Sequence, residues 1–540
     1  MADDASEPAP ERAAPERAAP ERAAPEQWAV RASVVFALLL AIGYGLLAGG
    51  SLDFCLDDAW IHLAYAESLR LGDGLSYNPG DRETGFSSPL WVVLLAAWPS
   101  GSNPVIAVKL LGALLHAATA GLAATLALEL GRARASLGDP SDAARLWRRS
   151  GPVPLASITG FAGLLTATSP TLLQSASSGM EVSLTAVLLL AGVLASVREQ
   201  WLIASIAAAL AELARPEALA FIGVFALILA LARRQPRALL PILAAALALA
   251  AWVGYCLAVS GWPWPNTAYV KVGEPELAGG IAYLQVQVLP EQPWLIGLGG
   301  VVLIAAALVA DLAPDRDAVR RFDLLALLAG WLLALLATAF SRPLDPDVLF
   351  YQSRYFAIFA ALPPIAVALG LARLHRVVAL ICLVPIVVIT GIALPRTHAL
   401  QRSQERGIAL LHDGPAGFVA RELPADAVIA VEGAGAMRHH TPRSMTILDV
   451  MGLNFAAIAH APDDAEKACV LVRAAPGWFV LPEHIAAPLS RVFVFRPLES
   501  FVDPRNAQVA EPHELRVWLL AVEGVRDPWR ERCAASPSSD

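Results

Sequence analysis

Two adjacent carboxylates, Asp57 and Asp58, follow the first long apolar run of the 540-residue chain almost directly. Carboxylates at a membrane surface are costly unless they are solvated, bind a metal ion, or serve as acid and base groups. The run from Asp58 to Leu71 has the pattern of an amphipathic helix lying along a membrane. A purely structural role is the alternative, because acidic side chains in the first turn of a helix are favoured by its dipole.

Further polar side chains share that helix face or stand at the ends of later apolar runs. His62 comes four residues after Asp58 and Tyr65 seven residues after it, which predicts that all three share one helix face. For each charged residue at the end of a run, an anchor that reaches the membrane surface is the alternative to a functional role. The candidates at these ends are Glu181, Arg215, Glu217, Asn266, Tyr269, Lys271, Arg354 and Tyr355.

Together, these side chains predict a cavity in which carboxylates lie beside cations. Such a cavity suits a lipid-linked phosphate as the leaving group, with a carboxylate that deprotonates an acceptor hydroxyl. Asp57 and Asp58 could also hold a divalent metal ion, Mg²⁺, Mn²⁺ or Ca²⁺, on that phosphate. The sequence indicates no other cofactor.

The composition decides what kind of protein must position these residues. Hydrophobic residues make up 56% of the chain and charged residues 16%, against roughly 25% charged residues in an ordinary globular protein. A surface with so few charges excludes a soluble enzyme and a disordered protein. The net charge of −8 argues against a nucleic-acid partner. We therefore expect a polytopic helical membrane protein in contact with membrane lipid.

The apolar runs predict about eleven membrane spans. Short Arg-rich loops stay in the cytoplasm, which predicts an N-terminus inside and a C-terminus outside. Residues 86–98 are apolar but short, and we expect a re-entrant or interfacial segment there. The runs expected to cross are 28–49, 103–131, 153–172, 180–197, 200–214, 216–231, 238–259, 293–310, 322–340, 351–372 and 377–394.

Three regions follow from this pattern. Residues 1–27 repeat Pro, Ala, Glu and Arg and predict a disordered tail. Residues 28–394 form the membrane module, with the functional residues of its first outer loop in 50–85. Residues 395–540 regain charge and contain strand-like runs between turn residues, which predicts a small outer α/β domain. Cys469 and Cys533 could pair there if the domain lies outside the cytoplasm, and two free thiols are the alternative.

The first outer loop resembles that of a GT-C-type family of membrane glycosyltransferases that includes the mycobacterial terminal arabinofuranosyltransferase. The similarity spans roughly residues 50–460. Two positions depart from the family pattern, in which Ala64 is often Arg and His62 is often a small residue. The matching segments are Asp57-Asp58-Ala59, Tyr65-Ala66, Gly72-x-Gly74-Leu75, Tyr77-Asn78-Pro79-Gly80, Glu83-x-Gly85-Phe86, Pro89-Leu90-Trp91, Ser178-Gly179-Met180-Glu181, Arg215-Pro216-Glu217, Pro265-Asn266-Thr267-x-Tyr269-x-Lys271, Arg354-Tyr355, Gly433-Ala434-Gly435 through Thr441, and Leu448-Asp449-x-x-Gly452-Leu453.

The resemblance implies a GT-C fold, here mainly α with a small C-terminal α/β domain. It implies an enzyme of the bacterial cytoplasmic membrane that moves a sugar from a polyprenyl phosphate to a glycan, lipid or protein on the outer face. The sugar could be arabinofuranosyl or another pentosyl or hexosyl group.

The resemblance also implies roles for the candidate residues. Asp57 or Asp58 would be the general base, and the other would hold a metal ion or orient a group. The remaining assignments are phosphate binding by Arg215, Lys271 and Arg354, sugar or cation contacts by Glu181 and Glu217, a substrate groove lined by Asn266 and Tyr269, and further substrate contacts by His62, Tyr65 and Tyr355.

Two other kinds of protein compete with this interpretation. A non-catalytic envelope or flagellum-associated protein could use the same fold, but it would have no need of the aspartate pair. A transporter of lipid-linked sugars would place ionisable residues near the membrane midplane and often contain internal repeats. Here the charged residues gather at one predicted face, which favours the transferase.

Overall fold

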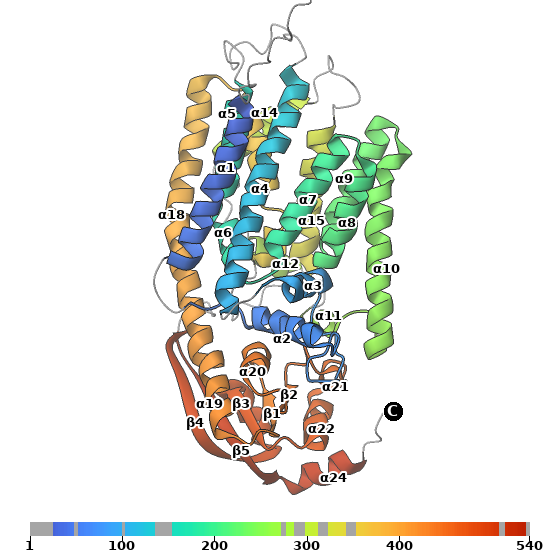
Figure 1. Cartoon of the computed structure of the whole chain (residues 1–540), viewed down its shortest axis with the longest axis vertical. Coiled ribbons are helices and arrows are strands. Elements are labelled where there is room, and N and C mark those ends of the chain that lie inside the picture. The colour runs from blue at the N-terminus through green and yellow to red at the C-terminus, as the bar shows by residue number, and fades with distance from the viewer. Residues whose placement is uncertain are drawn as a thin grey trace, which may run out of the picture.

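The computed structural model describes residues 25–47, 52–99, 103–135, 154–271, 277–285, 298–311, 322–341, 353–506 and 513–535. A bundle of long helices forms one end of the molecule, and a domain built on a small sheet forms the other (Figure 1). The predicted N-terminal tail up to residue 24, most of the basic loop 132–149 and the basic loop 316–321 lie outside the described residues.

The bundle carries the expected apolar helices. Within the described ranges, five helical segments are long and apolar enough to cross a membrane, and shorter apolar helices of 10–17 residues accompany them. The chain is therefore a multi-pass membrane protein. The long segments are Pro25–Leu46, Pro104–Arg132, Pro236–Ser260, Asp323–Ser341 and Arg376–Glu422.

The helices of the bundle follow the predicted runs closely. Two runs are broken in the structure, and in both the second helix has a proline in its first turn, where no amide hydrogen is needed. Run 153–172 becomes α5 and α6, and run 351–372 becomes α16 and α17. The elements are α1 (Pro25–Ile42), α4 (Pro104–Ala135), α5 (Leu155–Ala167), α6 (Pro170–Ser177), α7 (Val182–Val197), α8 (Trp201–Ala214), α9 (Ala218–Arg233), α10 (Leu240–Ser260), α12 (Leu277–Tyr283), α14 (Leu298–Asp311), α15 (Asp323–Ser341), α16 (Arg354–Ala357), α17 (Leu362–Leu371) and α18 (Arg376–Ile408).

Small residues let these helices approach closely. A Cβ atom on Gly112 of α4 would lie 1.8 Å from the carbonyl oxygen of Ala176 in α6. A Cβ atom on Gly370 of α17 would lie 2.0 Å from the carbonyl oxygen of Leu303 in α14. Such contacts are the usual means of packing helices in a membrane, where burial of apolar surface gives little drive for association.

Three short helices lie where the bundle meets the C-terminal domain: α2 (Asp57–Leu71), α3 (Pro89–Ala97) and α11 (Asn266–Lys271) (Figure 1). Helix α3 has 9 residues and is about 13 Å long, far short of the roughly 30 Å of a bilayer core. Helix α2 differs from the expected amphipathic helix because residues 59–66 are all buried. The C-terminal domain covers the face that a membrane-surface helix would leave in water, and α2 packs on α20 of that domain.

The C-terminal domain contains a five-stranded sheet in the order β2-β1-β3-β5-β4. The first three strands in sequence run parallel, and β5 runs antiparallel to both β3 and β4. This domain confirms the expected fold class, mainly α with a small C-terminal α/β domain. The elements are α19 (Gly414–Glu422), β1 (Val428–Val431), α20 (Ala434–His440), β2 (Thr446–Asp449), α21 (Ala456–Ala459), α22 (Asp464–Ala474), β3 (Trp478–Pro482), α23 (Glu483–Leu489), β4 (Phe493–Asn506), β5 (His513–Val525) and α24 (Asp527–Ala535).

Two features tie this domain together and to the bundle. Cys469 of α22 and Cys533 of α24 form a disulfide, which was one of the two alternatives expected from the sequence. Helix α18 runs from the bundle into the C-terminal domain without a break (Figure 1), so the predicted boundary at residue 395 lies inside one helix. Only the apolar part of α18 is suited to a membrane, because the polar residues after 395 lead to the sheet.

Candidate active site

Asp57 and Asp58 are the first two residues of α2, and the structure gives them different partners. The Asp57 carboxylate accepts hydrogen bonds from the backbone N–H groups of Gly435 and Ala436, at 2.7 and 2.8 Å. The Nδ1 atom of His412 lies 3.4 Å from Asp57 Oδ1. Asp57 therefore binds the first turn of α20, where a carboxylate satisfies amide groups that have no partner within the helix.

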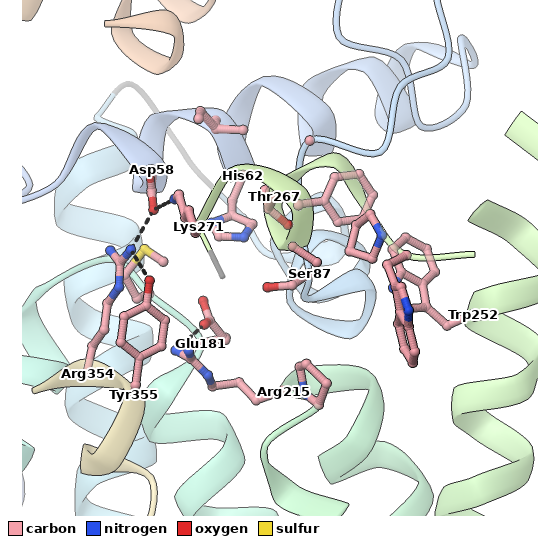
Figure 2. Close-up of a pocket in the computed structure, with 18 of the residues that line it drawn as sticks. Asp58, His62, Ser87, Glu181, Arg215, Trp252, Thr267, Lys271, Arg354 and Tyr355 are labelled. Atoms are coloured by element: carbon pink, nitrogen blue, oxygen red, sulfur yellow. Dashed lines mark hydrogen bonds and ion pairs between the residues drawn. The ribbon is translucent and has the colours of Figure 1, made fainter. Parts of the chain in front are cut away.

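Asp58 points in a different direction, into a cavity at the end of the bundle. Its Oδ2 atom accepts hydrogen bonds from Lys271 Nζ at 2.7 Å and from Arg354 Nη2 at 2.9 Å (Figure 2). Burial would raise the pKa of Asp58, but the two cations hold that pKa well below its usual value. Asp58 is therefore ionised, and its basicity is low while both cations contact it.

A second charge cluster lies nearby at the ends of three helices. Arg215, directly after α8, donates from Nη1 to Glu181 Oε1 at 2.7 Å. Its Nε and Nη2 atoms donate to the two oxygens of Glu217 at 3.2 and 3.1 Å. Glu181 and Glu217 stand at the N-caps of α7 and α9. Pro216 ends α8 at Arg215, since the residue before a proline is disfavoured in a helix.

Tyr355 joins the two clusters. The guanidinium groups of Arg215 and Arg354 each lie 5.1 Å from the centre of its ring, within the range of a cation–π interaction. Arg354 Nη2 also donates to the Tyr355 hydroxyl at 3.2 Å. The aromatic ring thus holds both arginines in place.

The cavity encloses about 750 Å³ of space, part of it open to solvent. Its two sides differ in character, because Asp58 and Arg354 lie on one side and Trp252 lies on the other (Figure 2). A concave site that combines apolar walls with a few charged groups is the usual setting for binding a small molecule or the head of a larger one. The residues that line it include Asp58, His62, Phe86, Ser87, Met180, Glu181, Arg215, Leu249, Trp252, Trp264, Thr267, Lys271, Arg354 and Tyr355.

His62 and Tyr65 were expected to share a face with Asp58, and they separate in the structure. His62 lines the cavity, and its buried Nδ1 atom has no hydrogen-bond partner among the described residues. Burial lowers the pKa of His62, which favours the neutral ring. Tyr65 accepts from the Gly85 amide at 3.2 Å and donates to Asn454 at 3.1 Å. Seven residues advance a helix by about 10 Å, which carries Tyr65 past the cavity.

Asn266 and Tyr269 lie on helix α11 but do not line the cavity. Asn266 donates to Glu83 Oε2 at 2.8 Å, and Tyr269 packs its ring edge against His460. The other side of α11 carries Thr267 and Lys271 into the cavity. Asn266 and Tyr269 therefore fix the helix that presents Lys271.

Glu83 was not among the predicted site residues, although it falls within a matching motif. One of its oxygens accepts from Asn266, and Oε1 accepts from the Ala456 amide at 3.1 Å, in the first turn of α21. Glu83 thereby links the first outer loop, α11 and the C-terminal domain. Trp252 was also missed, because a tryptophan inside an apolar run is indistinguishable by sequence from one that faces lipid.

The metal expectation can be tested on the donor atoms. The described residues contain no group of three or more His, Cys, Asp or Glu side chains that could hold a metal ion. Asp57 and Asp58 face different elements, and each carboxylate already accepts two hydrogen bonds. The pair is therefore not arranged as ligands of one shared divalent ion.

We compared the sequence and the fold with those of known proteins. No protein-family model and no curated protein matches the sequence. Among solved structures, ArnT from Cupriavidus metallidurans in the apo state is similar with a TM-score of 0.54 and 14% identity, over 91% of this chain and 98% of that chain. The same protein bound to undecaprenyl phosphate gives a TM-score of 0.52 at 14% identity, over 92% and 98% of the two chains.

A second protein has a similar structure. The archaeal oligosaccharyltransferase AglB from Archaeoglobus fulgidus, in complex with an inhibitory peptide and a dolichol-phosphate, gives a TM-score of 0.54 at 12% identity. The match covers 87% of this chain and 73% of that one. At such low identity these similarities show the fold, which is GT-C-like as expected. The narrower resemblance to the arabinofuranosyltransferase stays a prediction.

Proposed function

We propose that the chain is a glycosyltransferase that moves a sugar from a polyprenyl phosphate to a hydroxyl of a glycan, lipid or protein. The proposal rests on one observation: Lys271 and Arg354 donate hydrogen bonds to Asp58 in a cavity whose other side is apolar. Cations suit the phosphate, an apolar wall suits the start of a lipid chain, and a carboxylate suits the acceptor proton. The lipid phosphates bound to ArnT and AglB support this choice of donor.

The reaction breaks one bond at the anomeric carbon and forms another, and one proton moves from the acceptor to the base. The acceptor oxygen bonds to the anomeric carbon of the sugar, and the bond from that carbon to the phosphate oxygen breaks. The electron pair leaves with the polyprenyl phosphate, whose added charge Lys271 and Arg354 offset. The acceptor hydroxyl gives its proton to Asp58, the aspartate of the pair that faces the cavity.

The other candidate residues receive narrower roles. Arg215 is bonded to two carboxylates, so it suits the phosphate less well than the two cations at Asp58. Glu181 Oε2 is buried and has no partner among the described residues, so it is available to a sugar hydroxyl. His62 and Tyr355 complete the lining of the cavity. Asp57, Tyr65, Asn266, Glu217 and Tyr269 act by holding the elements around it.

The disulfide between Cys469 and Cys533 supports an orientation. Disulfides persist in oxidising compartments and are rare in the cytosol. We therefore assign the C-terminal domain, and the cavity beside it, to the outer face of a bacterial cytoplasmic membrane. This agrees with the orientation expected from the Arg-rich loops.

The test compares envelope glycans by linkage analysis in a deletion strain that carries the wild-type gene or an equally expressed variant. One linkage should disappear on deletion, return with the wild-type gene and stay absent with Asp58→Asn. Asp57→Asn, which alters an interdomain contact, should restore that linkage in part. If Asp58→Asn restores every linkage, the transferase proposal is wrong and the chain has a non-catalytic role.

A further inference from the structure

We propose that the lipid-linked donor activates the general base by taking its ion-pair partners. In this scheme the donor phosphate displaces the Asp58 carboxylate from Lys271 and Arg354, and Asp58 becomes an effective base only when the donor is bound. The inference rests on the proposed function and adds to it an order of events: donor first, acceptor deprotonation second.

The geometry makes the carboxylate and the phosphate competitors. Both cations converge on one atom, Asp58 Oδ2, at 2.7 and 2.9 Å. A phosphate oxygen seeks the same charge-assisted hydrogen bonds at the same distances. The Nη1 atom of Arg354 is buried and has no partner among the described residues, so it can donate to a further anionic oxygen. The site therefore offers a phosphate more donors than Asp58 uses.

The charge balance shows which cluster an anion would choose. Lys271 and Arg354 face one carboxylate, which leaves one net positive charge. Arg215 faces two carboxylates, Glu181 and Glu217, which leaves one net negative charge. An incoming phosphate is attracted to the first cluster and repelled by the second. Asp58 is the only carboxylate bonded to those two cations among the described ion pairs, so it is the group with which the phosphate competes.

Displacement changes the chemistry of Asp58. The two cations hold its pKa low, so their transfer to the phosphate raises that pKa and strengthens the base. The carboxylate then lies beside a bound donor with an acceptor hydroxyl as its natural partner. Among the described residues, the other titratable or charged groups near Asp58 include Asp57 and His62 on α2, Glu181 before α7, Arg215 after α8, Tyr355 on α16 and Glu432 after β1.

The experiment measures binding of undecaprenyl phosphate, the lipid phosphate without its sugar, to the purified full-length protein in nanodiscs. Trp252 and Trp264 line the cavity and provide an intrinsic fluorescence signal. Removal of the competing carboxylate in Asp58→Asn should tighten binding by about tenfold, equivalent to roughly 1.4 kcal/mol, while transfer is lost. Asp58→Ala gives the same comparison if the amide is not tolerated.

Matched variants separate this inference from the proposed function. Glu217→Gln removes an equal charge from the Arg215 cluster, and it should change undecaprenyl phosphate binding far less than Asp58→Asn. Lys271→Ala should weaken binding. If Asp58→Asn and Asp58→Ala bind as the wild type does, or more weakly, the displacement scheme is wrong although the site is a lipid-phosphate site. If the wild type does not bind undecaprenyl phosphate, the proposed function itself fails.

Discussion

The first turn of α2 carries two aspartates whose carboxylates have different kinds of partner. On the side of the C-terminal domain, Asp57 meets backbone amides of α20 and the ring of His412; we call this set of contacts the seam. On the cavity side, Asp58 accepts hydrogen bonds from the ends of two long side chains, Lys271 and Arg354. Backbone partners are fixed by the fold, whereas Lys and Arg side chains can move to a new anion. The seam therefore fixes the position of α2 against the C-terminal domain, whereas in the cavity Lys271 and Arg354 can exchange Asp58 for another anion.

The largest expected effect comes from the cavity side. Asp58→Asn should lower the rate of glycosyl transfer by about 10²- to 10⁴-fold, the usual contribution of a general base. The melting temperature should also fall, because Lys271 and Arg354 lose their carboxylate partner, but most of the protein should stay folded at the assay temperature. The measurement is transfer by purified protein from a polyprenyl-phosphate sugar, followed alongside thermal unfolding. If Asp58→Asn loses folded protein in the same proportion as it loses rate, Asp58 acts on stability as Asp57 does, and its role as the general base is contradicted.

The seam should make stability depend on pH. Burial would lower the pKa of His412, but Asp57, Glu432 and Asp413 raise that pKa to about 9. A histidine with a raised pKa stabilises the fold fully below its unfolded pKa near 6.5, and this contribution is lost as the pH rises through about 9. The loss should be on the order of 3 kcal/mol, seen as a falling melting temperature over that range.

Asp53 lies beside Asp413, the residue after His412 in the chain, and its titration changes stability in the same direction. Burial and the neighbouring Asp413 raise the pKa of Asp53 to about 9, so its protonated form also favours the fold at lower pH. His412→Gln should therefore flatten the decline above pH 6.5 without abolishing it. A His412→Gln profile parallel to that of the wild type would show that His412 stays neutral when folded.

Close approach of α20 to α2 should be the next most sensitive feature. A Cβ atom on Gly435 would lie 2.2 Å from the backbone oxygen of Asp57 and 2.8 Å from the Ile61 amide. Gly435→Ala should cost about 1–3 kcal/mol of stability, the usual range for overpacking, and reduce transfer. Gly477→Ala is the control in the same domain, because its Cβ would meet no heavy atom within 4 Å. Equal melting temperatures for the two variants would contradict the tight seam.

The smallest effect concerns the hydroxyl of Tyr65. Tyr65→Phe leaves the Gly85 amide and Asn454 without this partner, which should cost about 1–2 kcal/mol of stability. The affinity for undecaprenyl phosphate should not change, because Tyr65 lies outside the cavity. Tyr269→Phe is the control, since residue Tyr269 is 37% exposed. A changed affinity in Tyr65→Phe alone would assign Tyr65 to substrate binding after all.

Much of the fold was predictable because its causes are local in the sequence. Apolar runs of sufficient length predict helices in a membrane. A proline fits the first turn of a helix, as in α6 and α17, although α18 continues through Pro385 and Pro395. The strand-like runs of the C-terminal domain were predictable for the same reason. The burial of α2 was not predictable. Its amphipathic pattern indicates one buried face, and it does not reveal that the C-terminal domain, whose strands span residues 428–525, covers the polar face as well.

The sequence predicted which residues belong to the candidate site, but not how their side chains are arranged. The polar residues at the ends of the apolar runs identified Asp58, Glu181, Arg215, Lys271 and Arg354, which the structure brings to one cavity. The same signal also selected Asn266 and Tyr269, which lie on the helix but outside the cavity. Sequence position reports the element on which a residue stands, and the rotation of that element decides what the side chain contacts.

The sequence by itself determined a multi-pass bundle with an acidic pair and several cations at one end, because hydropathy and charge are properties of short segments. Only the tertiary structure decided that the two aspartates differ. Asp57 meets a residue 378 positions away in the chain, and Asp58 meets residues 213 and 296 positions away. Adjacent helical residues point about 100° apart, and only the packing of distant elements determines what each one meets.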